Sequence, residues 1–313
     1  MPSSANFIEI DPAFVEKVIM ELASFGAVGA TGVSRTVYSP EWVAATDYYA
    51  RTCEEAGLDV HRDAVGNVWG RLRGSSGEKS VASGSHIDSQ TPGGRYDGAL
   101  GAVAALIAVK ALKEQFGPPK RTVEAVAFCE EESSRFPNAN YWGARAVTGR
   151  IAPGDPERVI AFSGETIAEA MREVGLDPAR IPDAKRDDID SFVELHIEQG
   201  PILEQAGLPV AVVDAITGIR HYGARISGVQ NHAGAFPMDI RHDPLAGFAE
   251  IASGLINPAH RVGRPAVTTV GRVLVEPNFP GIIPASVEFS IDARHPDAAA
   301  RRRLYEMHEN LMR

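Results

Sequence analysis

The chain has 313 residues, 44% of them hydrophobic, and a formal net charge of −10 at pH 7, so it can bury a sizeable core and form two domains. No block of basic residues stands out, which argues against nucleic acid as a partner. No apolar run approaches the roughly 20 residues that a membrane helix needs, so we expect no contact with a membrane.

The cysteines and the N-terminal sequence bear on the compartment in which the protein works. Cys53 and Cys129 are the two cysteines, too few for a secreted disulfide scaffold and in keeping with a reducing cytoplasm. The N-terminus, MPSSANFIEID, lacks the basic start and apolar centre of a signal peptide. We therefore expect a soluble, cytoplasmic protein.

Helices are expected first along the chain. Asp11 followed by Pro12 predicts the beginning of a helix that ends before Gly26. The pair Ser39 and Pro40 predicts a second helix in the same way. Both helices precede the first expected strand.

Strands then alternate with helical segments. The expected strands are 58–62, 67–72, 80–87, 121–129 and 192–197, and the expected helix between the third and fourth of them is 99–116. Strands that alternate with helices are typical of a layered α/β sheet.

Beyond about Asp214 the pattern changes. The expected strands there are 216–227, 266–275 and 288–293, and the expected helices are 244–255 and 298–312. This order suits a small α+β domain. We therefore expect a first domain over residues 1–213 and a second over residues 214–313.

Histidine and carboxylate side chains follow three strands of the first domain. His86 and Asp97 lie in GSHIDSQTPGGRYDG, the run Glu130–Glu132 follows the next strand, and His196 ends the last one. Imidazole and carboxylate groups are ligands of zinc and manganese. A lone histidine at a strand end is more often structural, and a glutamate run is usually a solvated face. Three such strand ends in one α/β domain nevertheless favour a metal site, because ligands bind at the carboxyl ends of its strands.

The glycines of residues 84–98 bear on how such a site would form. Glycine adopts backbone conformations that other residues avoid and allows groups to approach closely. We expect these glycines to let the loop fold Asp97 back beside His86. A carboxylate can then bridge two ions about 3.5–4 Å apart, and a further acid that is not a ligand can take a proton from water.

Four motifs in order along the chain resemble M20-type amidohydrolases: GSHIDSQTPGGRYDGALG, CEEESSRFPNANYWGARAVTG, ELHIEQGPILE and NHAGAFPMDIRHDPLA. The nearest branch contains N-carbamoyl-L-amino acid hydrolases, β-ureidopropionases and allantoate amidohydrolases. The resemblance implies an enzyme with two divalent ions, zinc or manganese, that hydrolyses a ureido or amide C–N bond of a small molecule. It also implies a catalytic domain with a mixed sheet, a ferredoxin-like dimerisation domain and a homodimer.

The resemblance assigns roles to residues of the first domain. The implied metal ligands are His86, Asp97, Glu132 and His196. Asp97 is implied to bridge the two ions, and Glu131 to act as general base and acid. Asp88 resembles the carboxylate that orients a ligand histidine; a turn-capping role in the glycine-rich loop is the alternative.

Three further residues resemble substrate-binding groups. Gln199 resembles a residue that contacts the substrate, and Arg294 one that holds a substrate carboxylate with its guanidinium fork. His232 resembles a histidine that the second domain lends to the active site of a partner subunit, where it stabilises an oxyanion. A surface glutamine, a turn histidine and an exposed arginine are the alternatives.

The sequence departs from the family pattern in two places. Gly281 stands where the family has an asparagine, so a substrate hydrogen bond is in doubt. The family chain also returns to the first domain after the second and supplies a last ligand histidine, whereas this sequence stops at Arg313. His308 is a poor substitute, and we therefore expect an incomplete catalytic domain and an incomplete second metal site.

Other functions stay open. An aminoacylase or peptidase of the same architecture would prefer N-acetyl to N-carbamoyl amino acids. A truncated, catalytically silent protein that only dimerises need not bind metal. Nucleotide-binding and serine-hydrolase motifs are absent from the sequence. The exact substrate is left open, since CEEESSRFP favours allantoate-type enzymes and SHIDSQ favours carbamoylases.

Overall fold

The computed structural model describes residues 8–313, and the contacts divide the chain after Gly207 into two compact units. The boundary expected from the sequence, between residues 213 and 214, lies a few residues later. The first part of the segment considered as a signal peptide lies outside the described residues. None of the helices within residues 8–313 combines the length and apolar character of a membrane span.

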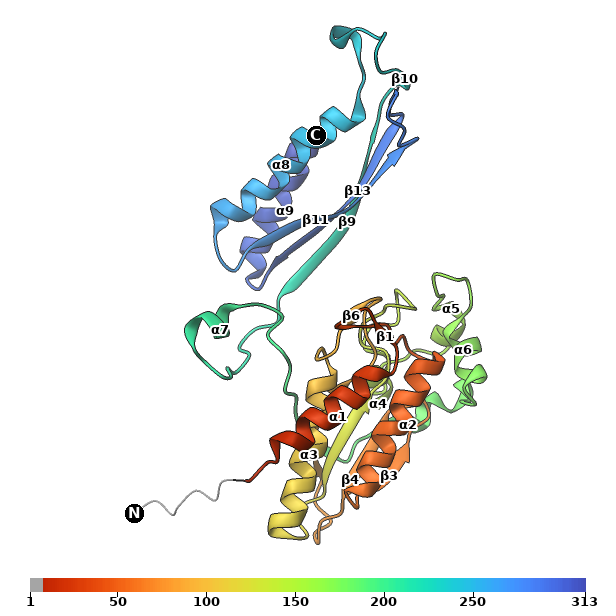
Figure 1. The fold of residues 1–313 in the computed structure, drawn as a ribbon, viewed down its shortest axis with the longest axis vertical. Helices are drawn as coiled ribbons and strands as arrows, with labels where there is room; N and C mark the ends of the chain where they lie inside the picture. The colour runs from red at the N-terminus through yellow and green to blue at the C-terminus, as the bar shows by residue number, and fades with distance from the viewer. Residues whose placement is uncertain (1–7) are drawn as a thin grey trace. The chain divides into compact units, whose positions relative to one another are not determined.

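Three helices cover one face of the sheet in the first unit. They are α1 (Pro12–Ser24), α2 (Pro40–Glu55) and α3 (Ala99–Phe116), which lie side by side in Figure 1. The Asp11 carboxylate caps α1 by accepting the N–H of Ala13, and the Ser39 hydroxyl caps α2 by accepting that of Trp42. The sequence signals for both helix starts are therefore confirmed.

The strands of the first unit form one mixed sheet, with the order β3-β4-β7-β5-β8 in the described part of the chain. The strands are β3 (Asp59–Arg62), β4 (Val68–Leu72), β5 (Ser80–His86), β7 (Val123–Phe128) and β8 (Ile189–Val193). Strand β5 lies between β7 and β8 and runs parallel to both, whereas β4 is antiparallel to both of its neighbours. The carboxyl ends of β5, β7 and β8 therefore meet at one edge of the sheet.

Short elements that the sequence did not predict hold the loops of this unit. The strands β1 (Ala27–Val28), β2 (Gly32–Val33) and β6 (Gly93–Gly94) pair in that order, which anchors the glycine-rich loop. The short helices are α4 (Trp142–Val147), α5 (Asp155–Arg158), α6 (Ile167–Glu173), α7 (Ile202–Ala206) and a 3-10 helix over Pro178–Ala184.

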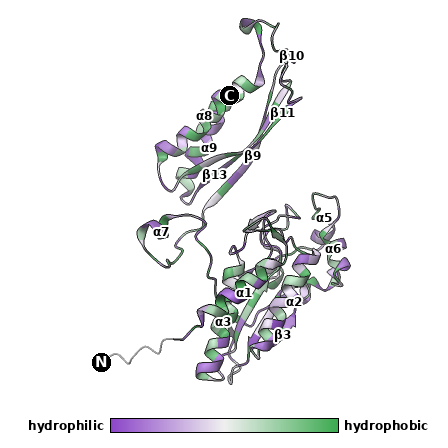
Figure 2. Ribbon diagram, viewed as in Figure 1, coloured by the Kyte–Doolittle hydropathy of each residue, from purple (hydrophilic) through white to green (hydrophobic). Residues whose placement is uncertain are grey.

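The second unit is a small α+β unit. Its antiparallel sheet has the order β11-β13-β9, formed by β9 (Gly218–Ser227), β11 (Val267–Glu276) and β13 (Ser286–His295). The helices α8 (Pro244–Val262) and α9 (Ala298–Met312) pack on one face around Leu255, Phe289 and Leu304. Both helices carry hydrophobic and hydrophilic residues in alternation, as Figure 2 shows. A shorter pair, β10 (Asn231–His232) and β12 (Ile282–Ile283), and a 3-10 helix over Met238–Ile240 complete this unit.

Two predicted element ends differ most from the structure. The strand expected over 192–197 ends at Val193, because β8 pairs with β5 only as far as Ser83. Beyond this point the chain crosses α3, where a Cβ at Gly101 would overlap the carbonyl oxygen of Leu195. The helix expected to end at Leu255 continues through Pro258 to Val262.

Candidate metal centre

His86 lies at the carboxyl end of β5 and is 2% exposed. Its ring Nδ1 lies 3.0 Å from the backbone oxygen of Asp88 and 3.4 Å from Oδ1 of the same residue. In the neutral ring, a proton on Nδ1 is donated toward Asp88 and the Nε2 lone pair is free to bind an ion, which is how outer carboxylates orient metal-binding histidines.

Asp97 returns to His86 at the end of the glycine-rich loop. Its Oδ1 lies 3.9 Å from His86 Nε2. The next residue, Gly98, has φ 63° and packs directly against His86, so that a Cβ at this position would overlap the imidazole ring. A glycine is therefore needed at position 98 for two reasons: the backbone is left-handed, and the His86 ring lies too close for a side chain.

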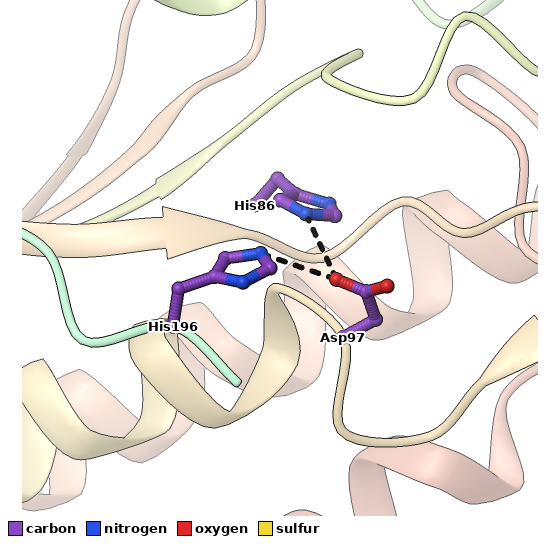
Figure 3. A group of neighbouring side chains, drawn as sticks. All are labelled: His86, Asp97 and His196. Atoms are coloured by element: carbon purple, nitrogen blue, oxygen red, sulfur yellow. Dashed lines mark ion pairs between the residues drawn. The ribbon is translucent and has the colours of Figure 1, made fainter. Parts of the chain in front are cut away.

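His196 reaches the same carboxylate from the loop after β8. Its Nε2 lies 3.1 Å from Asp97 Oδ1, and the two histidine rings stack with centroids 6.0 Å apart. Figure 3 shows both rings pointing at the Asp97 carboxylate. Each of the three side chains offers one ligand atom, and these atoms lie within 4.8 Å of one another.

The donor atoms of this group fit a divalent ion. His86 Nε2 is buried and has no hydrogen-bond partner within residues 8–313, and the buried Asp97 Oδ1 has its ion-pair contact with His196 Nε2 at 3.1 Å. Buried polar atoms in proteins are nearly always paired, and leaving them unpaired costs free energy. Two imidazole nitrogens and a carboxylate oxygen are a donor set that zinc and manganese accept.

The glutamate run follows β7 and turns around Asp88. The Asp88 carboxylate accepts the backbone N–H of Glu131 at 3.1 Å and that of Glu132 at 3.0 Å. Asp88 therefore fixes this turn as well as the His86 ring. Glu130 points into the core and is 1% exposed, while Glu131 places Oε2 3.7 Å from His86 Nε2.

A second possible ligand group contains His86, Glu131 and Glu132, with ligand atoms again within 4.8 Å of one another. The side-chain amide of Gln90 donates to Glu132 Oε2 at 2.8 Å and to its backbone oxygen at 3.2 Å. Sequence reasoning missed Gln90. Its position in the glycine-rich loop, two residues after Asp88, is the signal that could have drawn attention to it.

The acids of the centre have few positive partners. Burial raises the pKa values of Glu131 and Glu132, and burial together with Asp88 raises that of Glu130 to about 9. None of these three glutamates forms an ion pair with lysine or arginine in the described part of the chain. The centre is therefore short of positive charge.

The two histidines respond to the same surplus of negative charge. Burial lowers the pKa of His86, but the neighbouring carboxylates of Asp88, Glu131 and Glu132 outweigh it and raise the pKa to about 10. The close Asp97 carboxylate raises the pKa of His196 to about 8. Conversely, His196 is the main cause of the lowered pKa of Asp97.

Gln199 also belongs to this centre. Its side-chain amide donates to Asp97 Oδ2 at 2.7 Å, and its backbone has φ 58°. The sequence suggested a contact with the substrate, whereas the structure gives Gln199 a contact with the carboxylate expected to bridge two ions.

The other predicted site residues lie in the second unit. His232 is in β10, where its Nδ1 accepts the backbone N–H groups of Gly234 and Ala235. Arg294 is in β13 and donates to Asp292. Gly281 directly precedes β12.

His308 is a buried residue of α9. Its Nδ1 pairs with the Tyr222 hydroxyl at 2.7 Å, and its Nε2 lies 3.3 Å from the Thr268 hydroxyl. Both ring nitrogens therefore have partners inside the second unit, and His308 serves the packing of α9 on the sheet.

Comparisons with known proteins identify the family. Residues 57–310 match Peptidase family M20/M25/M40. The chain belongs to this family. It is 42% identical over 300 residues to allantoate amidohydrolase of Escherichia coli (strain K12), covering 96% of this chain and 73% of that protein. It is 40% identical over 291 residues to N-carbamoyl-L-amino acid amidohydrolase of Geobacillus stearothermophilus, covering 92% and 70% of the two chains.

Solved structures of similar proteins agree with the assignment of the chain to this family. A hydantoinase/carbamoylase family amidase from Burkholderia ambifaria superposes with a TM-score of 0.80 at 30% identity, covering 97% of this chain and 73% of that one. AtUAH in complex with (S)-hydroxyglycine superposes with a TM-score of 0.83 at 32% identity, covering 97% and 74%. The resemblance to M20-type amidohydrolases is therefore confirmed.

Proposed function

We propose that this member of the M20 family is a metal-dependent amidohydrolase that cleaves a ureido C–N bond. The substrate class is an N-carbamoyl amino acid or a related ureido compound such as allantoate. One observation carries the proposal: His86 Nε2, Asp97 Oδ1 and His196 converge in one group, in which His86 Nε2 is buried without a hydrogen-bond partner among the described residues. Relatives named as amidohydrolases of such compounds support the substrate class.

Two divalent ions, zinc or manganese, are proposed as cofactors. His86, Asp97 and His196 would hold one ion. Asp97 and Glu132 would contribute two carboxylates to the other, and Gln90 would orient Glu132 through its amide. Bound ions supply a more acidic water and a polarised substrate carbonyl.

Glu131 is proposed as the general base and acid. Its carboxylate is 34% exposed, lies beside His86 and is free of any lysine or arginine partner in residues 8–313. It would take a proton from the attacking water and return it to the nitrogen of the cleaved bond. Asp88 would hold Glu131 in place through the backbone of the glutamate turn.

Residues of the second unit are proposed to act on the substrate. Arg294 would bind the substrate carboxylate, and His232 would donate to the developing oxyanion in the active site of a partner subunit. Gln199 would contact the substrate beside Asp97. The chain would therefore work as a homodimer, and we place it in the cytoplasm, where its free cysteines Cys53 and Cys129 stay reduced.

Substrate turnover before and after chelation tests this function. N-carbamoyl-L-amino acids, allantoate, N-acetyl-L-amino acids and dipeptides are compared with zinc or manganese present. We expect hydrolysis of one ureido class, its loss with a chelator and its return with metal. Preference for the N-acetyl compounds would favour an aminoacylase, and an inactive chain that binds no metal would favour a silent dimerising protein.

A further inference from the structure

The sheet of the second unit carries a charged cluster on the face that α8 and α9 do not cover. The cluster consists of His221, Asp292 and Arg294. Side chains of a strand alternate between the two faces of the sheet. Ile291 and Ala293 are buried against the helices, so Asp292 and Arg294, which alternate with them, point to the other face. His221 of β9 is the direct cross-strand neighbour of Asp292.

Asp292 accepts three hydrogen bonds in this cluster. Arg294 donates through Nε to Oδ1 and through Nη2 to Oδ2, both at 2.8 Å. The His221 Nε2–H donates to Oδ2 at 2.7 Å. A guanidinium held at two nitrogens by one carboxylate is fixed in its plane.

The remaining edge of Arg294 is free. Nη1 has no hydrogen-bond partner in the described part of the chain, and the side chain is 43% exposed. We infer that Asp292 and His221 are positioning residues, which hold Arg294 so that its Nη1–Nη2 edge is presented to the substrate carboxylate. This inference rests on the proposed function and names the device by which the site selects substrates that carry a carboxylate.

The physical reason is the entropy of a long side chain. A free arginine samples many rotamers, and binding must immobilise it at a cost in affinity. Asp292 fixes the guanidinium when the protein folds, so this loss of side-chain entropy does not reduce the affinity for the substrate. His221 limits the movement of the Asp292 carboxylate in turn.

A second charged pair on the same face provides a matched control. Glu288 of β13 and Arg225 of β9 are cross-strand neighbours and form an ion pair of 2.7 Å. No hydrogen bond or ion pair joins Glu288 to the cluster within residues 8–313, so Glu288→Gln removes an exposed carboxylate from the same face and leaves the hydrogen bonds of Arg294 in place.

The experiment measures kcat and KM for an N-carbamoyl-L-amino acid and for its carboxamide, which lacks the carboxylate. In Asp292→Asn we expect KM for the acid to rise about tenfold, as expected when an arginine must be ordered on binding. We expect kcat to stay within about twofold and the carboxamide to be unaffected, because Arg294 meets no carboxylate there. His221→Gln should show a smaller rise, and Glu288→Gln none.

Each outcome decides between the alternatives. An equal rise for both substrates, a rise equalled by Glu288→Gln, or a lower KM in Asp292→Asn overturns the inference while the proposed function stands. Absence of wild-type turnover with every ureido compound overturns both. If Asp292→Asn fails to fold, His221→Gln carries the test, because that side chain is 68% exposed.

Discussion

The acids of the candidate metal centre and Asp292 on the uncovered sheet face of the second unit have opposite surroundings. Glu131 and Glu132 lie half-buried without an arginine or lysine ion pair in the described residues, and burial raises their pKa values. Asp292 is held by an arginine, and that contact is the main cause of its lowered pKa. Half-buried acids without a positive partner favour the binding of a cation, whereas an acid paired with an arginine leaves one edge of that arginine free for an anion.

Burial alone does not make this difference. Glu124 in β7 is fully buried, and burial raises its pKa, but Arg186 at 2.7 Å and Arg71 at 3.1 Å outweigh that effect and lower it. Its charge is balanced within the fold. The absence of a positive partner, rather than the degree of burial, therefore distinguishes the candidate metal centre from a structural ion pair.

The strongest test of the comparison removes one unpaired acid. Glu131→Gln keeps the shape of the side chain but not its basicity, so turnover should fall by about 10²-fold or more. Metal content should stay at the wild-type level, because Glu131 is proposed to be no ligand. Near-normal activity, measured on the preferred ureido compound, would remove Glu131 from the mechanism.

Metal binding should stabilise the first unit and leave the second unchanged. An ion at a concentration of 100 times its Kd adds about 2.7 kcal/mol to the free energy of unfolding. For a unit of this size that raises Tm by about 5–10 °C. Calorimetry with and without chelator measures the shift in Tm, and amide hydrogen exchange shows which residues the metal stabilises.

The comparison holds if added metal slows amide hydrogen exchange in the loop of residues 84–98 and leaves it unchanged in β13. Slower exchange in both units, or in neither, would contradict the assignment of the metal to the first unit.

Sequence patterns predicted the elements that local signals define. The helix expected over 99–116 is observed with those bounds, between Gly98 and Gly117. The pairing of His86 with Asp97 could be anticipated because both lie in one short loop whose glycines permit a tight return.

Features that depend on distant partners could not be predicted in this way. The end of β8 is set by the point where β5 stops pairing and α3 crosses, and nothing within residues 192–197 signals that point. Gln90 reaches Glu132 because Asp88 holds the backbone of Glu131 and Glu132 in a turn. These glutamates are distant from Gln90 in the sequence, so no local signal predicts the contact.

The loop glycines offer a sharper test of the metal centre. Gly98→Ala forces a Cβ into the His86 ring at a position with φ 63°, so His86 must shift. We expect metal affinity to fall at least about tenfold, as it does when groups that orient a ligand are disturbed. Gly94→Ala is the matched control, because no atom lies within 4 Å of a Cβ at this position of the same loop. Competition with a chromophoric chelator measures both variants, and equal affinities would show that the His86 position does not limit binding.

The smallest expected effect is a recovery of activity in mixed dimers, which tests whether the second unit of one subunit serves the metal centre of the other. If His232 of one chain serves the centre of its partner, then a Glu131→Gln chain and a His232→Ala chain are complementary. A mixed dimer would hold one intact site, formed by Glu131 of the second chain and His232 of the first. Random exchange makes half of the dimers mixed, so activity should return to about a quarter of the wild-type value in a two-fold symmetric dimer.

The parent variants provide the baseline for this measurement, since each alone has both sites damaged. Labelled chains show whether subunits have exchanged before activity is read. Exchange without recovery would mean that His232 acts within its own chain or outside the site altogether. Recovery would show that the metal-binding region of one subunit depends on the second unit of the other.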